Sequence, residues 1–359
     1  IGIDFKDLHL YNIDLGALVK IPNAINFSLY PTNTNPNFNK NRDGNTLPYL
    51  QPEGTLDLSN YTESLARFFN GVDLNKLQLV VNKTLPQTDL SYCFYNSTFD
   101  NGDRIAPVLE NLISVSNMDY CFYKTSVSDI SILNRVNFAN GTSMKYCFAY
   151  CPNIIELTDV TMSSKIGDSS YMFSGSGLTT VRNVTTSSRN ITGFFSYCNN
   201  LVIVENFVAD GTDSYESLFQ GCAMSLPPIT SIPDNIVNIK NMYRGCPNLT
   251  SINNFVFHEN LVEVEGFILD CEKLVNANNV TIAGAFYNDL FRGVTSLKYV
   301  NNLLISYIGR SMIFSHMFDG CTNLLEMSFH DDSYTEQVIS IDYMFRGTSM
   351  KTVDFSNVS

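Results

Sequence analysis

The chain has 359 residues, of which 44% are hydrophobic and 16% are charged, and its formal net charge is -13 at pH 7. Because nucleic-acid binding depends on clustered cations and this acidic chain has no basic run, we expect no nucleic-acid partner. The sequence has no apolar stretch of about 18 residues or more, so we expect no membrane-spanning segment. It begins without methionine and ends where a further repeat could start, so we expect it to belong to a longer protein or a larger assembly.

Residues 1 to 54 lack the repeat that occupies the rest of the chain. Positions 31 to 39 are rich in proline and asparagine, a composition that favours turns over helices or strands. We predict that residues 1 to 54 are an N-terminal cap, a linker or an attachment segment.

From residue 55 to residue 359 one short phrase recurs, an apolar pair followed three residues later by a small residue. Successive phrases are 22 to 28 residues apart, and a period of that length indicates a solenoid of about twelve coils of about 25 residues. One such unit cannot bury its own apolar residues, so it must stack on its neighbours. The pairs are Phe68-Phe69, Cys93-Phe94, Cys121-Phe122, Cys147-Phe148, Met172-Phe173, Phe194-Phe195, Leu218-Phe219, Met242-Tyr243, Phe267-Ile268, Leu290-Phe291, Met317-Phe318 and Met344-Phe345.

Most units continue with apolar residues at intervals of three, as in Leu178, Val181 and Val184. We expect this pattern to form one short strand in each coil, so that stacked coils give a parallel sheet. The aromatic phrase then forms a short helical turn opposite the strand.

A column of asparagines stands just before the last apolar residue of many units. We interpret it as a buried ladder that satisfies backbone groups where each coil turns, because an asparagine amide both donates and accepts hydrogen bonds. Surface asparagines in an asparagine-rich chain are the alternative. The ladder residues are Asn183, Asn206, Asn254, Asn279 and Asn302.

Nine cysteines fall in two columns that other units fill with apolar or small residues, which indicates a ladder of buried, reduced thiols. Side chains that point the same way rarely meet the dihedral angle of a disulfide, and no histidine lies near a cysteine pair, so we expect neither disulfide nor metal. At Cys246 we expect serine to leave a poorly paired buried hydroxyl. The first column is Cys93, Cys121 and Cys147, and the second is Cys151, Cys198, Cys222, Cys246, Cys271 and Cys321.

The segment Met317-Phe318-Asp319-Gly320-Cys321-Thr322-Asn323-Leu324 resembles the repeat phrase of the BspA-like leucine-rich repeat surface proteins. The similarity extends over roughly residues 55 to 359, although Ile268 replaces the aromatic residue and the first three units lack the small cysteine. The resemblance implies a leucine-rich-repeat-like solenoid and an extracellular recognition module of a microbial surface protein. Its partner would then be a glycan or protein on a host or target cell.

Catalysis finds little support in the sequence. The histidines at positions 9, 258, 316 and 330 stand alone, and no phosphate-binding loop or nucleophile grouping is present, so we expect no enzyme and no cofactor. The acidic loops Asp100 to Asp103 and His330 to Asp332 could bind calcium, but two carboxylates make a weak site and solvated loops are favoured.

Residues that alternate with the buried strand positions face outward and are mostly polar and uncharged. This composition suits hydrogen bonding to a glycan or glycoprotein, and a merely solvated face is the alternative. The candidate ligand-binding residues are Glu156, Arg182, Glu205, Asn253, Asn278, Tyr299 and Asn301.

We therefore predict a non-enzymatic adhesion module, extracellular or on the cell surface, that binds through its strand face. A phage tail or fibre component that recognises the host surface is the alternative, with the virion as its location. An enzyme is the third possibility, and the sequence does not identify the ligand.

Overall fold

The computed structural model describes residues 54–62, 64–283, 287–306, 312–330, 333, 338–351 and 353. Apart from Gly54, the predicted cap, linker or attachment segment therefore lies outside the described residues. Contacts between residues divide the chain into two units. Unit 1 comprises Ile1–Ile155 and Ser163–Gly177, and unit 2 comprises Glu156–Met162 and Leu178–Ser359.

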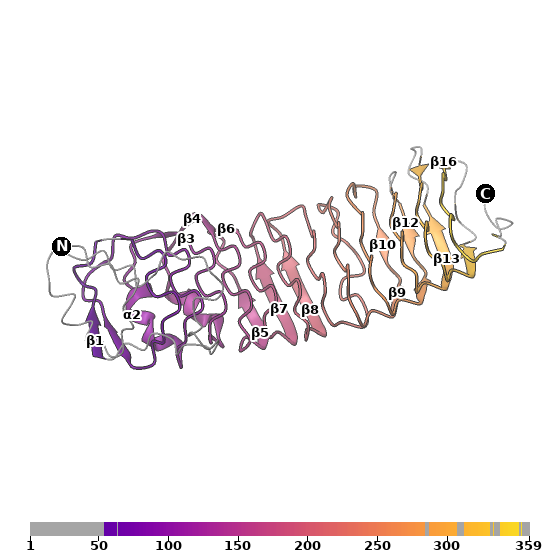
Figure 1. Cartoon of the computed structure of the whole chain (residues 1–359). Coiled ribbons are helices and arrows are strands. Elements are labelled where there is room, and N and C mark those ends of the chain that lie inside the picture. Colours follow the sequence, from indigo (N-terminus) through magenta and orange to yellow (C-terminus); the bar gives the residue numbers. More distant parts are fainter. Residues whose placement is uncertain are drawn as a thin grey trace, which may run out of the picture. The chain divides into compact units, whose positions relative to one another are not determined.

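Unit 1 combines short parallel strands with the few helical segments of the described chain (Figure 1). Strand β1 pairs with β2, and β4 pairs with both β3 and β6. The elements are β1 (Gly54–Asp57), β2 (Leu77–Val80), η1 (Gly102–Arg104), α2 (Ala106–Leu109), β3 (Val115–Asn117), η2 (Ile130–Arg135), β4 (Phe138–Ser143) and β6 (Ile166–Asp168).

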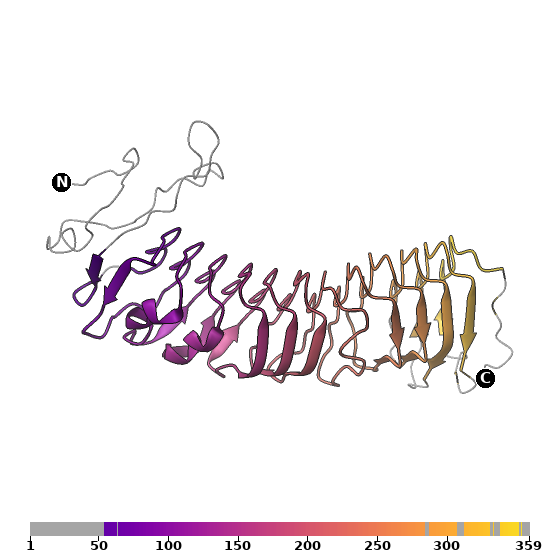
Figure 2. The same cartoon turned by 90° about the horizontal axis from the view of Figure 1, so that it is seen from below.

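Unit 2 consists of strands and turns only, within its described residues. Its sheets have the orders β5-β7-β8, β10-β12-β13-β11-β9 with β15 beside β13, and β14-β16. Figure 2 shows the strands repeated from one coil to the next. The strands are β5 (Glu156–Thr161), β7 (Thr180–Thr186), β8 (Ile203–Ala209), β9 (Ser251–Asn253), β10 (Val256–Phe257), β11 (Asn276–Asn278), β12 (Thr281–Ile282), β13 (Tyr299–Ile305), β14 (Met312–Ile313), β15 (Glu326–Phe329) and β16 (Val338–Ser340).

The predicted solenoid is confirmed: the coils form a parallel-strand β-solenoid of about 11 turns with little helix. All strand pairs among the described residues are parallel, and the buried apolar residues are in register, as for Leu157 opposite Val181. The expectation of one strand in each coil is too simple, because the coil with β9 also carries β10 and the coil around Pro227 and Pro228 carries no strand. Proline has no N–H to donate to a neighbouring strand, and this explains why the coil around Pro227 and Pro228 has no strand.

The aromatic phrases form turns that are hydrogen-bonded from one coil to the next. They are not the helical turns that the sequence led us to expect. In the phrase at Cys93-Phe94, Tyr92 and Asn96 have φ of 56° and 55°, which no right-handed helix accommodates. Alternate N–H groups instead donate to the next coil, as from Phe94 to the carbonyl oxygen of Cys121 at 2.9 Å. The turns therefore extend the hydrogen-bonded ladder around the coil, on the side away from the strands.

Stacked aromatic rings form the core behind these turns. In unit 1, Phe69, Phe94, Phe122, Phe148 and Phe173 stack with centroid separations of 5.2 to 5.7 Å and interplanar angles of at most 9°. In unit 2 the rings of the phrases at 195, 219 and 243 stack in the same way, at 5.8 and 5.6 Å. The phrase is therefore the repeated core contact that holds neighbouring coils in register.

Candidate functional site

The seven predicted ligand-binding residues all lie in unit 2, and they fall into two groups. Three are on β5, β7 and β8, where Arg182 lies opposite Glu205 and its Nε donates to Glu205 Oε2 at 2.8 Å. On β5, Thr158 donates to Glu156 Oε1 at 2.6 Å. These side chains are exposed or half-buried, so the charges remain accessible to a ligand.

The other four residues lie on β9, β11 and β13, where three asparagines form a side-chain ladder. Asn278 Nδ2 donates to Asn253 Oδ1 at 2.8 Å, and Asn301 Nδ2 donates to Asn278 Oδ1 at 2.8 Å. Tyr299, two residues before Asn301 and on the same strand face, lies between Asn276 and Glu326 in the sheet register. Its half-buried ring has no ring contact and its hydroxyl no hydrogen bond among the described residues.

A second ladder runs beside the first, through the asparagine column identified in the sequence. Asn279 Nδ2 donates to Asn254 Oδ1 at 3.0 Å, and Asn302 Nδ2 donates to Asn279 Oδ1 at 2.8 Å. In the sheet with β5, Asn206 donates to Asn183 and Asn183 to Asp159, at 2.9 and 2.7 Å.

The expectation that this column is buried is wrong: four of its five asparagines are exposed and Asn302 is half-buried. All five have φ between 52° and 60°. Asparagine tolerates this left-handed region better than other residues with a Cβ, and its amide then faces solvent at the bend of the strand. Asparagine therefore recurs at this position because the strand bends there with a positive φ, and not because buried backbone groups need a partner.

The two groups of candidate residues do not form one continuous sheet. Between β8 and β9 the coil that contains Pro227, Pro228 and Pro233 has no strand among its described residues, and at the position of the strand face it makes an isolated bridge from Ser231 to Val256. The strand face of unit 2 is therefore a charged patch on β5, β7 and β8 and an amide patch on β9, β11, β13 and β15.

All nine cysteines are buried free thiols. The residues that stand three positions after the apolar pair are here called the small column, and several of them also donate hydrogen bonds to the preceding coil. The Sγ of Cys222, Cys271 and Cys321 donates to the carbonyl oxygen of Phe195, Tyr243 and Phe291 in the preceding coil, at 3.0 to 3.1 Å. Ser97 Oγ makes the equivalent bond to the Phe69 carbonyl at 3.0 Å. Sequence reasoning identified the size requirement of this column and missed its hydrogen-bond donor.

Sequence reasoning also missed an array of seven tyrosines on the turns of unit 1. Four of them stand one residue before the apolar pair in consecutive coils, a regularity that is visible in the sequence. The tyrosine array comprises Tyr92, Tyr95, Tyr120, Tyr123, Tyr146, Tyr150 and Tyr171.

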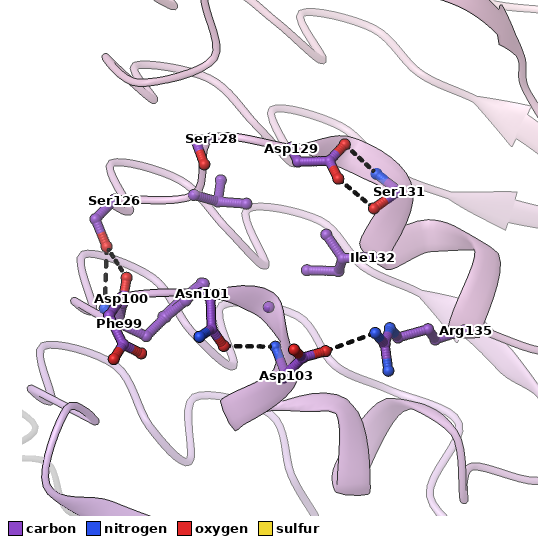
Figure 3. Close-up of a pocket in the computed structure, with 12 residues that line it drawn as sticks. Phe99, Asp100, Asn101, Asp103, Ser126, Ser128, Asp129, Ser131, Ile132 and Arg135 are labelled. Carbon is purple, nitrogen blue, oxygen red and sulfur yellow. Dashed lines mark hydrogen bonds and ion pairs between the residues drawn. The ribbon is translucent and has the colours of Figure 1, made fainter.

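A polar hollow of about 280 Å³ lies between η1 and η2 in unit 1 (Figure 3). Its polar groups already bond one another, because Asp103 pairs with Arg135 at 2.6 Å and Asp129 accepts from the N–H of Ser131 at 2.8 Å. A hydrogen bond from Arg104 lowers the pKa of Asp100, one of the carboxylates considered for calcium. These local partners leave little free capacity for a ligand or an ion.

Among the described residues, no cluster of three or more His, Cys, Asp or Glu side chains suits a metal ion, and no helix has the length and apolarity to cross a bilayer. Asp331 and Asp332 of the second acidic loop, and His9, lie outside the described residues. His316 Nδ1 lies 3.0 Å from Asp319 Oδ2, a carboxylate that Arg346 also contacts, so its neighbours form an ion-pair cluster without a nucleophile.

No family model and no curated protein matches the chain. A leucine-rich repeat protein from Bacteroides ovatus is similar to it with a TM-score of 0.48 and 16% identity, over 83% of this chain and 76% of that one. A leucine-rich repeat protein from Eubacterium ventriosum is similar with a TM-score of 0.40 and 14% identity, over 78% of this chain and 84% of that one. The resemblance to the BspA-like family therefore stays a prediction.

Proposed function

We propose that this chain is a non-enzymatic recognition module of a microbial extracellular surface protein. It adheres to a glycan or glycoprotein of a host or target cell through the strand face of unit 2. The amide patch on β9, β11, β13 and β15 is the centre of the binding surface, and the charged patch on β5, β7 and β8 extends it.

This proposal rests on one observation: the asparagine amides of the ladders keep hydrogen-bond donors and acceptors that no protein group uses within the ladder. An asparagine amide has two N–H donors and two acceptor lone pairs. Asn278 uses one donor toward Asn253 and one acceptor toward Asn301, so one donor and one acceptor remain. Stacked coils repeat these groups about every 4.8 Å, which suits the hydroxyls of a sugar chain.

Tyr299 supplies the apolar part of the surface. Its ring makes no aromatic contact with the residues that the structure describes, so it can stack on the C–H face of a sugar while the neighbouring amides bond the hydroxyls. The ladder also fixes the asparagine side chains before binding, which reduces the conformational entropy lost in the complex.

The first experiment screens the folded chain on an array of glycans and glycoproteins and then measures the affinity of variants for the tightest probe. Asn253, Asn278 and Asn301 do not have positive φ, so alanine fits their backbone. Each single change to alanine, and Tyr299→Ala, should weaken binding only a few-fold, because the contacts are shared over several coils. The quadruple alanine variant should bind at least about tenfold more weakly.

A matched control separates the two ladders. Replacing Asn254, Asn279 and Asn302 with glycine keeps the left-handed backbone and removes the second row of amides. This triple variant should keep most of the affinity if the first ladder and Tyr299 form the centre of the site. Parent-like binding by the quadruple variant, with an unchanged melting temperature, would contradict the proposal.

A further inference from the structure

The tyrosine array of unit 1 consists of two rows of closely stacked rings. In the first row Tyr92, Tyr120, Tyr146 and Tyr171 follow one another at centroid separations of 4.7 to 4.8 Å, with interplanar angles of 4 to 11°. In the second row Tyr95 stacks on Tyr123 at 4.8 Å and 6°, and Tyr150 follows, tilted by 59° at 5.3 Å. Tyr92 and Tyr95 are 5.6 Å apart, so the two rows adjoin.

The first row occupies backbone positions that disfavour a bulky side chain. Its four tyrosines have φ of 54 to 58°. At the equivalent position in four coils of unit 2 the chain has glycine, serine or asparagine instead. A left-handed tyrosine costs on the order of 1 kcal/mol, and a stacked aromatic pair contributes a similar amount. The stacking energy therefore offsets the cost of the left-handed backbone. It does not explain why tyrosine recurs at this position. The unit 2 residues are Gly193, Ser217, Asn241 and Gly266.

Stacking leaves mainly the positive parts of these rings accessible. An aromatic ring is negative on its faces and positive at its edge. The faces are covered by neighbouring rings, by the Arg67 guanidinium 4.5 Å above Tyr92, and by Lys124 Nζ at 5.4 Å from the Tyr123 centroid. The accessible groups are thus ring edges and phenol hydroxyls, which favour anions and hydrogen-bond acceptors.

The hydroxyls of Tyr95, Tyr123 and Tyr146 have no hydrogen-bond partner among the described residues. Partial burial raises the pKa of Tyr123 and of Tyr146 to about 12, so both remain neutral donors at physiological pH. Arg67 and Lys124 have no carboxylate within 4.0 Å in the part of the chain that the structure describes. The nearby Asp168 is already paired with Lys145 at 3.4 Å, and Asp119 accepts from Ser143 at 2.6 Å.

We propose that the tyrosine array, with Arg67 and Lys124, is a second binding surface, and that its ligand is an anionic polysaccharide. The two unpaired cations bind carboxylates of the polymer, and the phenol hydroxyls donate to its sugar oxygens. A regular row of donors suits a repeating polymer, because the sugar oxygens of such a polymer also recur at regular intervals. This surface lies in unit 1 and does not depend on the amide patch of unit 2.

The test measures binding of the whole chain to immobilised polygalacturonate, which carries a carboxylate on every sugar, and to its fully methyl-esterified form, which is neutral. The parent should bind the acid form at least about tenfold more tightly, and added salt should weaken that binding. The double variant Arg67→Gln and Lys124→Gln should lose about tenfold in affinity for the acid form. The double variant Tyr95→Phe and Tyr123→Phe keeps the stacked rings, removes two donors, and should lose several-fold.

Two controls separate binding at the tyrosine array from binding elsewhere on the chain. Lys83→Gln removes an exposed cation that bonds Asn60 outside the array, and should leave the affinity unchanged. The quadruple alanine variant of the unit 2 amide patch should also bind polygalacturonate as the parent does. Equal binding of the acid and esterified polymers, or parent-like binding by both double variants, would overturn the proposal. Equally tight binding of polyglutamate would assign the surface to an acidic protein instead.

Discussion

The thiol of Cys246 donates a hydrogen bond of 3.3 Å to the carbonyl oxygen of Phe219, which lies in the preceding coil. The backbone N–H of Cys222 also donates to this carbonyl, at 3.1 Å, and the small residue of the next coil supplies a second donor. Ser97 and Thr125 show that a hydroxyl can occupy the same column and bond a phrase carbonyl. A serine at position 246 should therefore find the same acceptor, which argues against the expectation of a poorly paired hydroxyl.

Cys246→Ser should change the free energy of unfolding by less than about 1 kcal/mol, because the hydroxyl donates to the same carbonyl. Cys246→Val has a similar size and no donor, so it should destabilise unit 2 more than serine does, by about 1 to 1.5 kcal/mol, the net contribution of one hydrogen bond. Urea unfolding of the three proteins measures both values. Equal destabilisation by serine and valine would show that packing, rather than the hydrogen bond, selects cysteine.

The buried thiols should be inert in the native protein. Burial raises the pKa of Cys151 to about 11 and that of Cys321 to about 12, so almost no thiolate is present at pH 8. A thiol reagent should label few sites in native protein and all nine after denaturation without reductant. Rapid native labelling, or fewer than nine thiols after denaturation, would contradict the buried free-thiol columns.

Asn279 should be replaceable by glycine but not by a β-branched residue. Its φ of 52° is left-handed, so Asn279→Val should cost about 1 to 3 kcal/mol through backbone strain. Asn279→Gly should cost less, because glycine adopts this conformation freely. Asn278→Val is the matched control, since its backbone does not have a positive φ. Thermal unfolding of the three variants should give the largest loss for Asn279→Val.

Asp319 should make the stability of unit 2 dependent on acid pH. Its side chain is 8% exposed and accepts from Arg346 at 2.9 and 2.5 Å, and these hydrogen bonds lower its pKa from 3.8 to about 2. A lowered folded-state pKa means that the carboxylate stabilises the fold above about pH 4 and loses this effect as pH falls toward 2. Asp319→Asn should lower the melting temperature at pH 7, and the difference from the parent should shrink between pH 4 and pH 2. A difference that is independent of pH would contradict this role.

The sequence predicted the solenoid because the core depends on residues that recur with the coil. Phe122 and its counterparts must stack, so their spacing gives the repeat length directly. Pro227 and Pro228 were also a visible sign that one coil lacks a strand, although the expectation of one strand in each coil ignored them.

Side-chain relations between coils were harder to predict, because they depend on the register and on backbone conformation. The burial of Asn279 was predicted wrongly, since the sequence shows its neighbour Val280 but not the bend that turns the amide outward. The Asn253 and Asn278 ladder needs both residues at one register position, which only the stacked coils show. The tyrosine stacks need the same information, although the recurrence of tyrosine before the apolar pair was a usable signal.

The most direct test of recognition through the strand face observes the amides themselves. In protein labelled selectively at asparagine, the side-chain Nδ2 signals of Asn253, Asn278 and Asn301 are followed by NMR during titration with the tightest glycan from the array. Binding at the amide patch predicts that these three signals shift together, with the same saturation curve as the measured affinity. Saturation of binding with these signals unmoved, while signals of asparagines elsewhere in the chain shift, would contradict the account.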